Sequence, residues 1–176
     1  MCAPTRAVNP VQLPSETLEA LYSAAASARA CAHAPYSKFP VGAALLGADG
    51  RIFGGCNVEN ASFGLTLCAE RGALARAIAD GARQFRALAL VGGGSRLLTP
   101  CGACRQALHE FAPELAVYSR VLTDRGTGFT KLGTGLTNLG TGFTDLGTGF
   151  TDGSWSLRAL LPDAMDAQDL PQTPRP

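Results

Sequence analysis

Two cysteine-containing segments constrain the fold of this chain more than any other feature. One is Leu-Cys-Ala-Glu-Arg at 67–71, the other is Thr-Pro-Cys-Gly-Ala-Cys-Arg-Gln at 99–106, and each begins a predicted helix. Thiolates at helix N-termini are stabilised by free backbone N–H groups and by the positive end of the helix dipole. Cys68, Cys101 and Cys104 can therefore bind one metal ion, which requires a fold in which the two helix starts meet.

The number of cysteine ligands indicates a catalytic rather than a structural site. Cys101 and Cys104 can chelate an ion from a single turn, and Cys68 is the third ligand. Structural zinc sites usually have four protein ligands, whereas catalytic sites have three and leave one position for water, whose pKa falls to about 7. One zinc ion per chain is therefore expected. Taken alone, Cys101 and Cys104 would also fit a redox pair of the thioredoxin type.

Glu70 favours the interpretation as a catalytic zinc site. It lies two residues after Cys68, close enough to reach water on the metal without being a ligand. A glutamate in the first turn of a helix is more often a surface residue that interacts with the helix dipole. Beside three cysteines at this spacing it becomes a candidate general acid and base, and the combination matches the signature of zinc deaminases.

The rest of the chain alternates between helix-like and strand-like patterns. Helices are predicted from Ser15, its expected N-cap, to before Pro35, and over 68–80, 101–111 and 156–161. Strands are predicted over 39–46, 51–57, 86–91 and 115–122, and the first two of them form a hairpin. This alternation predicts a three-layer α/β domain.

Residues 125–152 interrupt the alternation with four copies of a seven-residue unit such as Gly-Thr-Gly-Phe-Thr-Asp-Leu. Two glycines in each unit disfavour a helix and hence a coiled coil. A solenoid of stacked turns would also repeat at a fixed period, but each unit offers little apolar surface for a core. We interpret the segment as a flexible insertion that the chemistry does not need. It interrupts a single domain at 15–166, which has flexible tails at 1–14 and 167–176.

Charge and hydropathy argue against nucleic acids and membranes as partners. The formal net charge is only +1, with no basic stripe. No apolar run approaches the length of a membrane span, and the first fourteen residues contain no apolar stretch of signal-peptide length. We therefore expect a cytoplasmic protein, in which the six cysteines are thiols or metal ligands rather than disulfides.

Taken together, the motifs resemble the short, three-cysteine form of cytidine deaminase. The resemblance covers about residues 15–124 and 153–166 and includes two further motifs, Tyr-Ser-Lys-Phe-Pro-Val-Gly-Ala at 36–43 and Asn-Val-Glu-Asn-Ala at 57–61. It implies a homotetrameric α/β/α enzyme with a mixed sheet of about five strands. The implied reaction is zinc-dependent hydrolytic deamination of cytidine and deoxycytidine to uridine and deoxyuridine plus ammonia, in pyrimidine salvage.

The resemblance also implies roles for individual residues. Asn57 and Glu59 would bind ribose hydroxyls, Phe39 would pack on the nucleoside, Glu70 would transfer protons, and Arg71 would hydrogen-bond the ligand thiolates. A guanidinium suits that position, because three thiolates and one zinc ion carry a net negative charge. Without the resemblance, Glu59 and Arg71 would be interpreted as surface charges and Asn57 as a turn residue.

Two positions depart from the family's pattern. Phe63 stands where the family commonly has tyrosine, and Met165 stands where a phenylalanine from a neighbouring subunit commonly stacks on the base. Three alternatives remain open: blasticidin S as the substrate, cytosine in a nucleic acid, and a zinc-braced binding module without activity. The motif at 57–60, suited to an unmodified ribose, argues against the first, and the lack of a basic stripe argues against the second.

Overall fold

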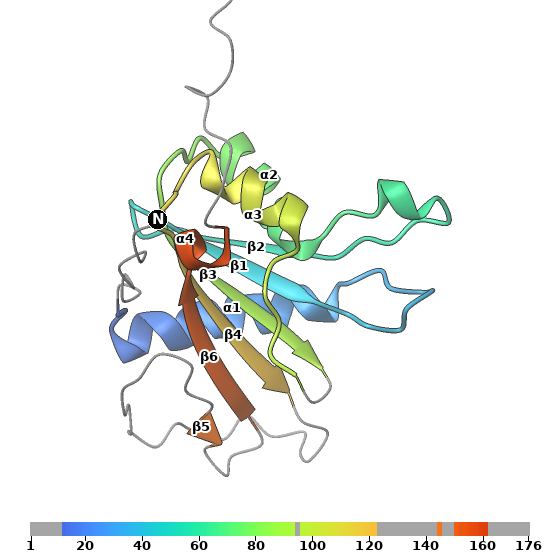
Figure 1. Ribbon diagram of the computed structural model, residues 1–176, viewed down its shortest axis with the longest axis horizontal. Helices are drawn as coiled ribbons and strands as arrows, with labels where there is room; N and C mark the ends of the chain where they lie inside the picture. Colours follow the sequence, from blue (N-terminus) through green and yellow to red (C-terminus); the bar gives the residue numbers. More distant parts are fainter. Residues whose placement is uncertain (1–11, 94–95, 123–143, 146–149, 162–176) are drawn as a thin grey trace, which may run out of the picture.

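A computed structural model describes residues 12–93, 96–122, 144–145 and 150–161 (Figure 1). The strands are β1 (Gly42–Gly47), β2 (Ile52–Cys56), β3 (Phe85–Gly93), β4 (Ala116–Leu122), β5 (Thr144–Asp145) and β6 (Phe150–Ser156). The helices are α1 (Ser15–Ala30), the short 3-10 helix η1 (Phe63–Leu65), α2 (Ala69–Ala79), α3 (Gly102–His109) and α4 (Leu157–Leu160). The strands form one sheet in the order β2-β1-β3-β4-β6-β5.

The sheet separates two hydrophobic cores, which gives the domain three layers. Strand β1 shows the alternation: Ala43 and Leu45 pack with α2 and α3, whereas Ala44 and Leu46 pack with α1 on the opposite face. Figure 1 shows α1 lying across one face and α2 and α3 across the other. The predicted α/β/α architecture is confirmed, and the sheet is mixed because β3 and β4 are parallel while the other pairs are antiparallel.

Strand direction explains why the two cysteine segments meet. Strands β2 and β3 are both antiparallel to β1, so they run in the same direction and end at the same edge of the sheet. Helix α2 follows β2 and helix α3 follows β3, and both helices pack on the same face. Their N-termini therefore lie at one sheet edge, as expected for the functional end of parallel strands.

Gly55 lets α2 approach the sheet closely. A β-carbon at this position would lie 2.2 Å from Ala73 N and 2.6 Å from Ala69 O, so the helix backbone rests directly on β2. No larger residue could occupy the position without moving the helix. Because Cys68 is the N-cap of α2, this contact also helps to place the first thiol of the site.

The predicted helices and the hairpin form, with ends that differ by a few residues: α3 ends at His109 rather than at Phe111, and β1 begins at Gly42 rather than at residue 39. The hairpin of β1 and β2 forms as predicted, and Gly81 follows α2 in the left-handed conformation, with φ of 87°. Ser15 is not the N-cap of α1: the cap is Pro14, whose carbonyl oxygen accepts the Leu18 N–H at 3.0 Å. In the described ranges, no helix is both long enough and apolar enough to span a membrane.

Strand β6 corrects the predicted boundary of the insertion. Residues 150–152, assigned to the insertion at 125–152, begin β6 and pair with 120–122 of β4. Asp152 also receives hydrogen bonds from Arg120 Nε at 2.7 Å and Nη2 at 2.8 Å, and Arg120 further donates to the Glu19 carboxylate. Residues 150–152, the end of the last repeat unit, are therefore part of the domain. Apart from β5, the remainder of 125–149 lies outside the described residues.

Only residues 12–14 of the two predicted tails, 1–14 and 167–176, lie within the described part of the chain. Leu13, within the tail predicted at 1–14, is buried in the core beneath α1, so the domain begins before Ser15. Residues 1–11 and 162–176 lie outside the described part of the chain, and they include Met165 and the predicted tail at 167–176.

We propose that the first three repeat units are dispensable for the stability of the fold, whereas the fourth unit is required for it. Deleting 126–146 removes the short strand β5 and joins β4 to β6 through the six residues 123–125 and 147–149, a usual length for a connection between two elements. The urea concentration at the midpoint of unfolding should be nearly the same for that variant as for the wild type. Deleting 125–152 instead removes the start of β6 and the Asp152 partner of buried Arg120, and should cost about 3 kcal/mol or more of the free energy of unfolding. Equal stability of the two deletion variants would contradict this role of the fourth unit.

Candidate zinc site

The three cysteines predicted as ligands meet where α2 and α3 begin. Cys68 is the N-cap of α2, Cys101 is the N-cap of α3, and Cys104 is buried in the first turn of α3. Their sulfur atoms all lie within 4.8 Å of one another, with 3.8 Å between those of Cys68 and Cys101 and 3.4 Å between those of Cys101 and Cys104. Tetrahedral zinc with Zn–S bonds of about 2.3 Å requires sulfur atoms about 3.8 Å apart. The sulfur geometry therefore fits zinc.

The three thiols differ in acidity. Burial raises the pKa of Cys68 and that of Cys104, and the neighbouring Glu70 carboxylate raises both further. Burial opposes ionisation of Cys101 too, but the hydrogen bond from the Cys104 backbone N–H and those shared with the two other thiols lower its pKa overall. Cys101 is thus the thiol that ionises most readily, and a metal that binds all three must displace protons from the other two.

Glu70 lies in the first turn of α2 and is buried, with 6% of its surface exposed. Burial raises the pKa of its carboxyl group, against smaller opposing effects of hydrogen bonds from its own backbone and from the Cys104 thiol. A carboxyl group with a raised pKa can gain and lose a proton closer to neutral pH than an exposed one. Its contact with Cys104 places this group next to the three sulfurs.

Arg71 lies beside the Cys68 thiol. Its Nη2 donates to Thr66 O at 3.1 Å, and hydrogen bonding to the Cys68 thiol is the main cause of its raised pKa. Its Nε is buried and has no hydrogen-bond partner among the described residues. This buried N–H group can donate a hydrogen bond to a cysteine sulfur when the thiol loses its proton and becomes a negatively charged thiolate.

Arg105 holds the loop that carries Cys101, a role that the sequence patterns do not predict. Its Nε donates to Pro100 O at 2.7 Å, its Nη1 to Leu160 O at 2.6 Å, and its Nη2 to Thr99 Oγ1 at 3.3 Å. The side chain therefore connects the two residues before Cys101 to the last residue of α4 through hydrogen bonds. The partners that reveal this role are up to 55 residues away in the chain, so no local spacing indicates it.

The segment with the predicted sugar contacts lies beside the zinc ligands. Val58 and Leu67 exchange backbone hydrogen bonds of 2.9 and 3.0 Å, and Leu67 directly precedes Cys68. This bridge brings Asn57 and Glu59 back to the start of α2. The structure thus brings together two groups of residues that the sequence analysis connected only by resemblance.

Asn57 joins this segment to the end of the loop before β1. Its Oδ1 accepts the Val41 N–H at 2.8 Å, and its Nδ2 donates to Phe39 O at 3.1 Å. An amide side chain has two donor hydrogens and two acceptor lone pairs. Within the described residues these contacts use one of each, so Asn57 keeps one donor and one acceptor for a ligand.

Glu59 is more engaged with the protein than the sequence analysis predicted. Its Oε2 accepts the N–H groups of Tyr36 at 2.9 Å and Ser37 at 3.2 Å, and its Oε1 accepts the Ser37 hydroxyl. These hydrogen bonds, led by that of the Ser37 hydroxyl, lower the pKa of Glu59. A carboxylate has about four acceptor positions, so its three contacts within the described part of the chain leave about one for a ligand.

Three aromatic side chains next to this network are exposed. Phe39 has 38% of its surface exposed, and Phe63, in η1, has 73%. The ring of Phe63 meets that of Tyr36 edge to face, with centroids 5.8 Å apart. Aromatic surface is therefore available near the sugar-contact segment, although Phe63 lacks the hydroxyl that tyrosine would bring.

Comparison with known proteins identifies the family. Residues 15–120 match the family model described as the cytidine and deoxycytidylate deaminase zinc-binding region. The chain belongs to this family. Membership and the sulfur geometry together establish the site as a zinc site of the deaminase type.

Individual relatives agree with this assignment. The chain is 52% identical over 94 residues to the cytidine deaminase of Sporosarcina psychrophila, covering 53% of this chain and 69% of the relative. The crystal structure of cytidine deaminase from Burkholderia pseudomallei aligns with a TM-score of 0.65 and 42% identity, over 84% of this chain and 98% of that one. That of Mycobacterium tuberculosis aligns with a TM-score of 0.61 and 36% identity, over 84% and 96%. The predicted family and fold are confirmed.

Proposed function

We propose that this protein is a zinc-dependent enzyme that hydrolyses cytidine and deoxycytidine to uridine and deoxyuridine, with release of ammonia. The observation that carries the proposal is the cluster of three thiols within 4.8 Å at two helix starts, with the buried Glu70 beside it. The similarity to cytidine deaminases supports the choice of substrate. A place in cytoplasmic pyrimidine salvage follows from that substrate as part of the same proposal.

Glu70 transfers the protons in the proposed reaction. Cys68, Cys101 and Cys104 would hold the zinc ion, which when bound would lower the pKa of water to about 7 and so provide the nucleophile. Glu70 accepts a proton from the attacking water and passes it to N3 of the cytosine ring while the oxygen bonds to C4. It then moves the second proton from that oxygen to the amino group, which leaves as ammonia. Burial suits Glu70 to both steps, because it raises the carboxyl pKa towards neutrality.

The side chains near β2 bind the sugar in this proposal. Glu59 and Asn57 offer the hydrogen-bonding positions that their protein contacts leave over, and both can pair with ribose hydroxyls. Phe39 presents an exposed ring that can pack on the nucleoside. Arg71 donates to the ligand thiolates and offsets their negative charge.

Glu59→Gln should weaken binding of cytidine but not of free cytosine. The substitution replaces a carboxylate acceptor by an amide, and loss of a hydrogen bond to a charged group should weaken cytidine binding roughly tenfold. Inhibition constants measured with the two ligands provide the comparison, since cytosine lacks every sugar hydroxyl. Equal losses for cytidine and cytosine would remove Glu59 from the sugar site.

We further propose a homotetramer. The support within this chain is the group of exposed apolar side chains on the segments around the sugar site: Tyr36, Phe39, Val58, Phe63 and Leu65. Exposed apolar surface of this kind is typical of interaction sites. Sedimentation should give a mass four times the 18.2 kDa of the chain, and a monomer at micromolar concentration would contradict the proposal.

A substrate panel tests the proposed function against its alternatives. Zinc-loaded protein is incubated separately with cytidine, deoxycytidine, blasticidin S and a cytosine-containing single-stranded DNA, and ammonia is measured. We expect ammonia from the two nucleosides only. Release from blasticidin S or from DNA in preference to cytidine would identify the corresponding alternative, and no release from any substrate would favour a binding module.

A further inference from the structure

Ser37 contacts two residues that are predicted to bind the substrate, Glu59 and Phe39. Its hydroxyl group donates a hydrogen bond to Glu59 Oε1. The oxygen of that hydroxyl group, Ser37 Oγ, accepts a hydrogen bond from the Phe39 N–H at 3.0 Å. The Ser37 backbone N–H donates to the other carboxylate oxygen of Glu59 at 3.2 Å. A serine hydroxyl has one hydrogen to donate, and here that hydrogen is committed to Glu59 while the oxygen holds the backbone of Phe39.

The backbone next to Ser37 needs this support. Lys38 has φ of 57°, the left-handed region that a residue with a side chain rarely adopts. Its N–H donates to Ala34 O at 3.2 Å and closes a turn over 34–38. The left-handed residue sets the direction in which the chain leaves the turn, and the next residue is Phe39.

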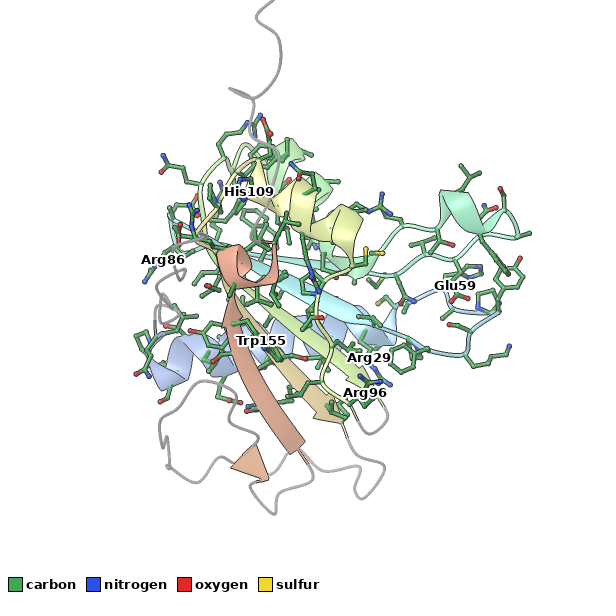
Figure 2. All side chains as sticks on the ribbon, viewed as in Figure 1. Arg29, Glu59, Arg86, Arg96, His109 and Trp155 are labelled. Atoms are coloured by element: carbon green, nitrogen blue, oxygen red, sulfur yellow. The ribbon has the colours of Figure 1, made fainter. Side chains whose placement is uncertain are left out.

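Phe39 is held from a second side. Its carbonyl oxygen accepts Nδ2 of Asn57, while its N–H donates to Ser37. Figure 2 shows the labelled Glu59 between the two loops that extend from this end of the sheet. Both backbone polar groups of Phe39 are thus bonded to side chains that also hold, or belong to, the predicted sugar contacts.

We infer that Ser37 is a positioning residue for nucleoside binding, whose hydroxyl holds the Glu59 carboxylate and the Phe39 backbone in a fixed relative arrangement. The inference rests on the proposed function and adds a residue to it. Ser37 does not touch the substrate. It directs the remaining acceptor position of Glu59 and the ring of Phe39 to the same ligand, so that the sugar meets both at once without rearrangement of the loop.

Loss of the hydroxyl should also change the pH dependence of binding. The Ser37 hydroxyl is the main cause of the lowered pKa of Glu59, with help from the N–H groups of Tyr36 and Ser37 and from His33, and against partial desolvation. Without it the pKa of Glu59 rises. Because the sugar hydroxyl is accepted by the ionised form, binding is lost as pH falls through that pKa. The acidic limb of kcat/KM should therefore move to higher pH.

The experiment compares Ser37→Ala with Ser37→Thr, which keeps a hydroxyl, and with Ser62→Ala, which removes an exposed hydroxyl from the neighbouring loop. Ser37→Ala should raise KM for cytidine roughly tenfold, the loss expected for one hydrogen bond to a charged group. The kcat value and the inhibition constant of free cytosine should change less than about twofold, and the acidic limb of kcat/KM should move to higher pH. Ser37→Thr and Ser62→Ala should behave like the wild type.

Binding measurements separate this inference from the proposed function. Calorimetry with cytidine in a Glu70→Gln background reports affinity without turnover, and adding Ser37→Ala should weaken that affinity roughly tenfold. If Ser37→Ala does not fold, Ser37→Cys, with its weaker donor, should show the same loss. An unchanged cytidine affinity, or an equal loss for cytidine and cytosine, overturns the role of Ser37. A wild-type protein that binds cytidine but releases no ammonia overturns the proposed function alone.

Discussion

The Glu70→Gln variant is expected to turn over cytidine at least ~100-fold more slowly than the wild type while keeping its zinc. Glutamine has the size of glutamate and can hydrogen-bond, but it cannot accept a proton, and positioned proton transfer contributes 10²-fold or more to such reactions. Glu70 is buried beside Cys104, but it does not belong to the group of three cysteines that can hold a metal ion. The variant should therefore keep its zinc. Steady-state kinetics and metal analysis of the same preparation measure both effects.

Glu16→Gln is the matched control for this substitution. Glu16 also lies in the first turn of a helix, but it is on α1 and exposed. If position in the first turn were all that mattered, the two variants would behave alike. Near-normal turnover in Glu70→Gln would show that another group transfers the proton, and loss of zinc would show that Glu70 contributes to the metal site.

The Cys101→Ala variant is expected to lose most of its zinc and, with it, all measurable deamination. Cys101 lies between the other two cysteines of the cluster, with its sulfur 3.8 Å from that of Cys68 and 3.4 Å from that of Cys104. It is also the thiol that ionises most readily, because its hydrogen bonds lower its pKa. Two remaining thiols leave zinc with half of a tetrahedral ligand set, and metal affinity falls steeply when a ligand is removed.

Elemental analysis after dialysis measures the zinc that remains on the protein. Cys31→Ala provides the control, since Cys31 is an exposed free cysteine outside the cluster. That variant should keep about one zinc ion per chain. Full zinc retention by Cys101→Ala would exclude Cys101 as a ligand, and equal losses in both variants would point to non-specific binding by thiols.

The parts of the site that depend on local spacing could be predicted from the sequence. Cys68 and Cys101 become N-caps because an apolar helical pattern follows each of them, and Cys104 lies one turn further along. The β1–β2 hairpin also has local causes, which are its apolar runs and the turn between them. Strand and helix order then brings the two helix starts to one edge of the sheet.

The features that were not predicted depend on contacts between distant residues. Strand β6 lies partly in a glycine-rich repeat with weak strand propensity, and it forms because β4 pairs with it and Arg120 bonds to Asp152. The hydrogen bonds of Ser37 to Glu59 span 22 residues of the chain. Such pairings appear only when the sheet has brought the segments together, so no local pattern indicates them.

A zinc titration of the metal-free protein tests whether deamination of cytidine requires one zinc ion per chain. Zinc is added in steps to a known amount of chain, and uridine and ammonia formed from cytidine are measured after each addition. We expect no product without metal, a rate that rises in proportion to added zinc, a break at about one zinc ion per chain, and equal amounts of uridine and ammonia throughout. Product formation that does not depend on zinc would contradict a zinc-dependent reaction, and a folded, zinc-saturated protein that leaves cytidine unchanged would contradict cytidine as the substrate.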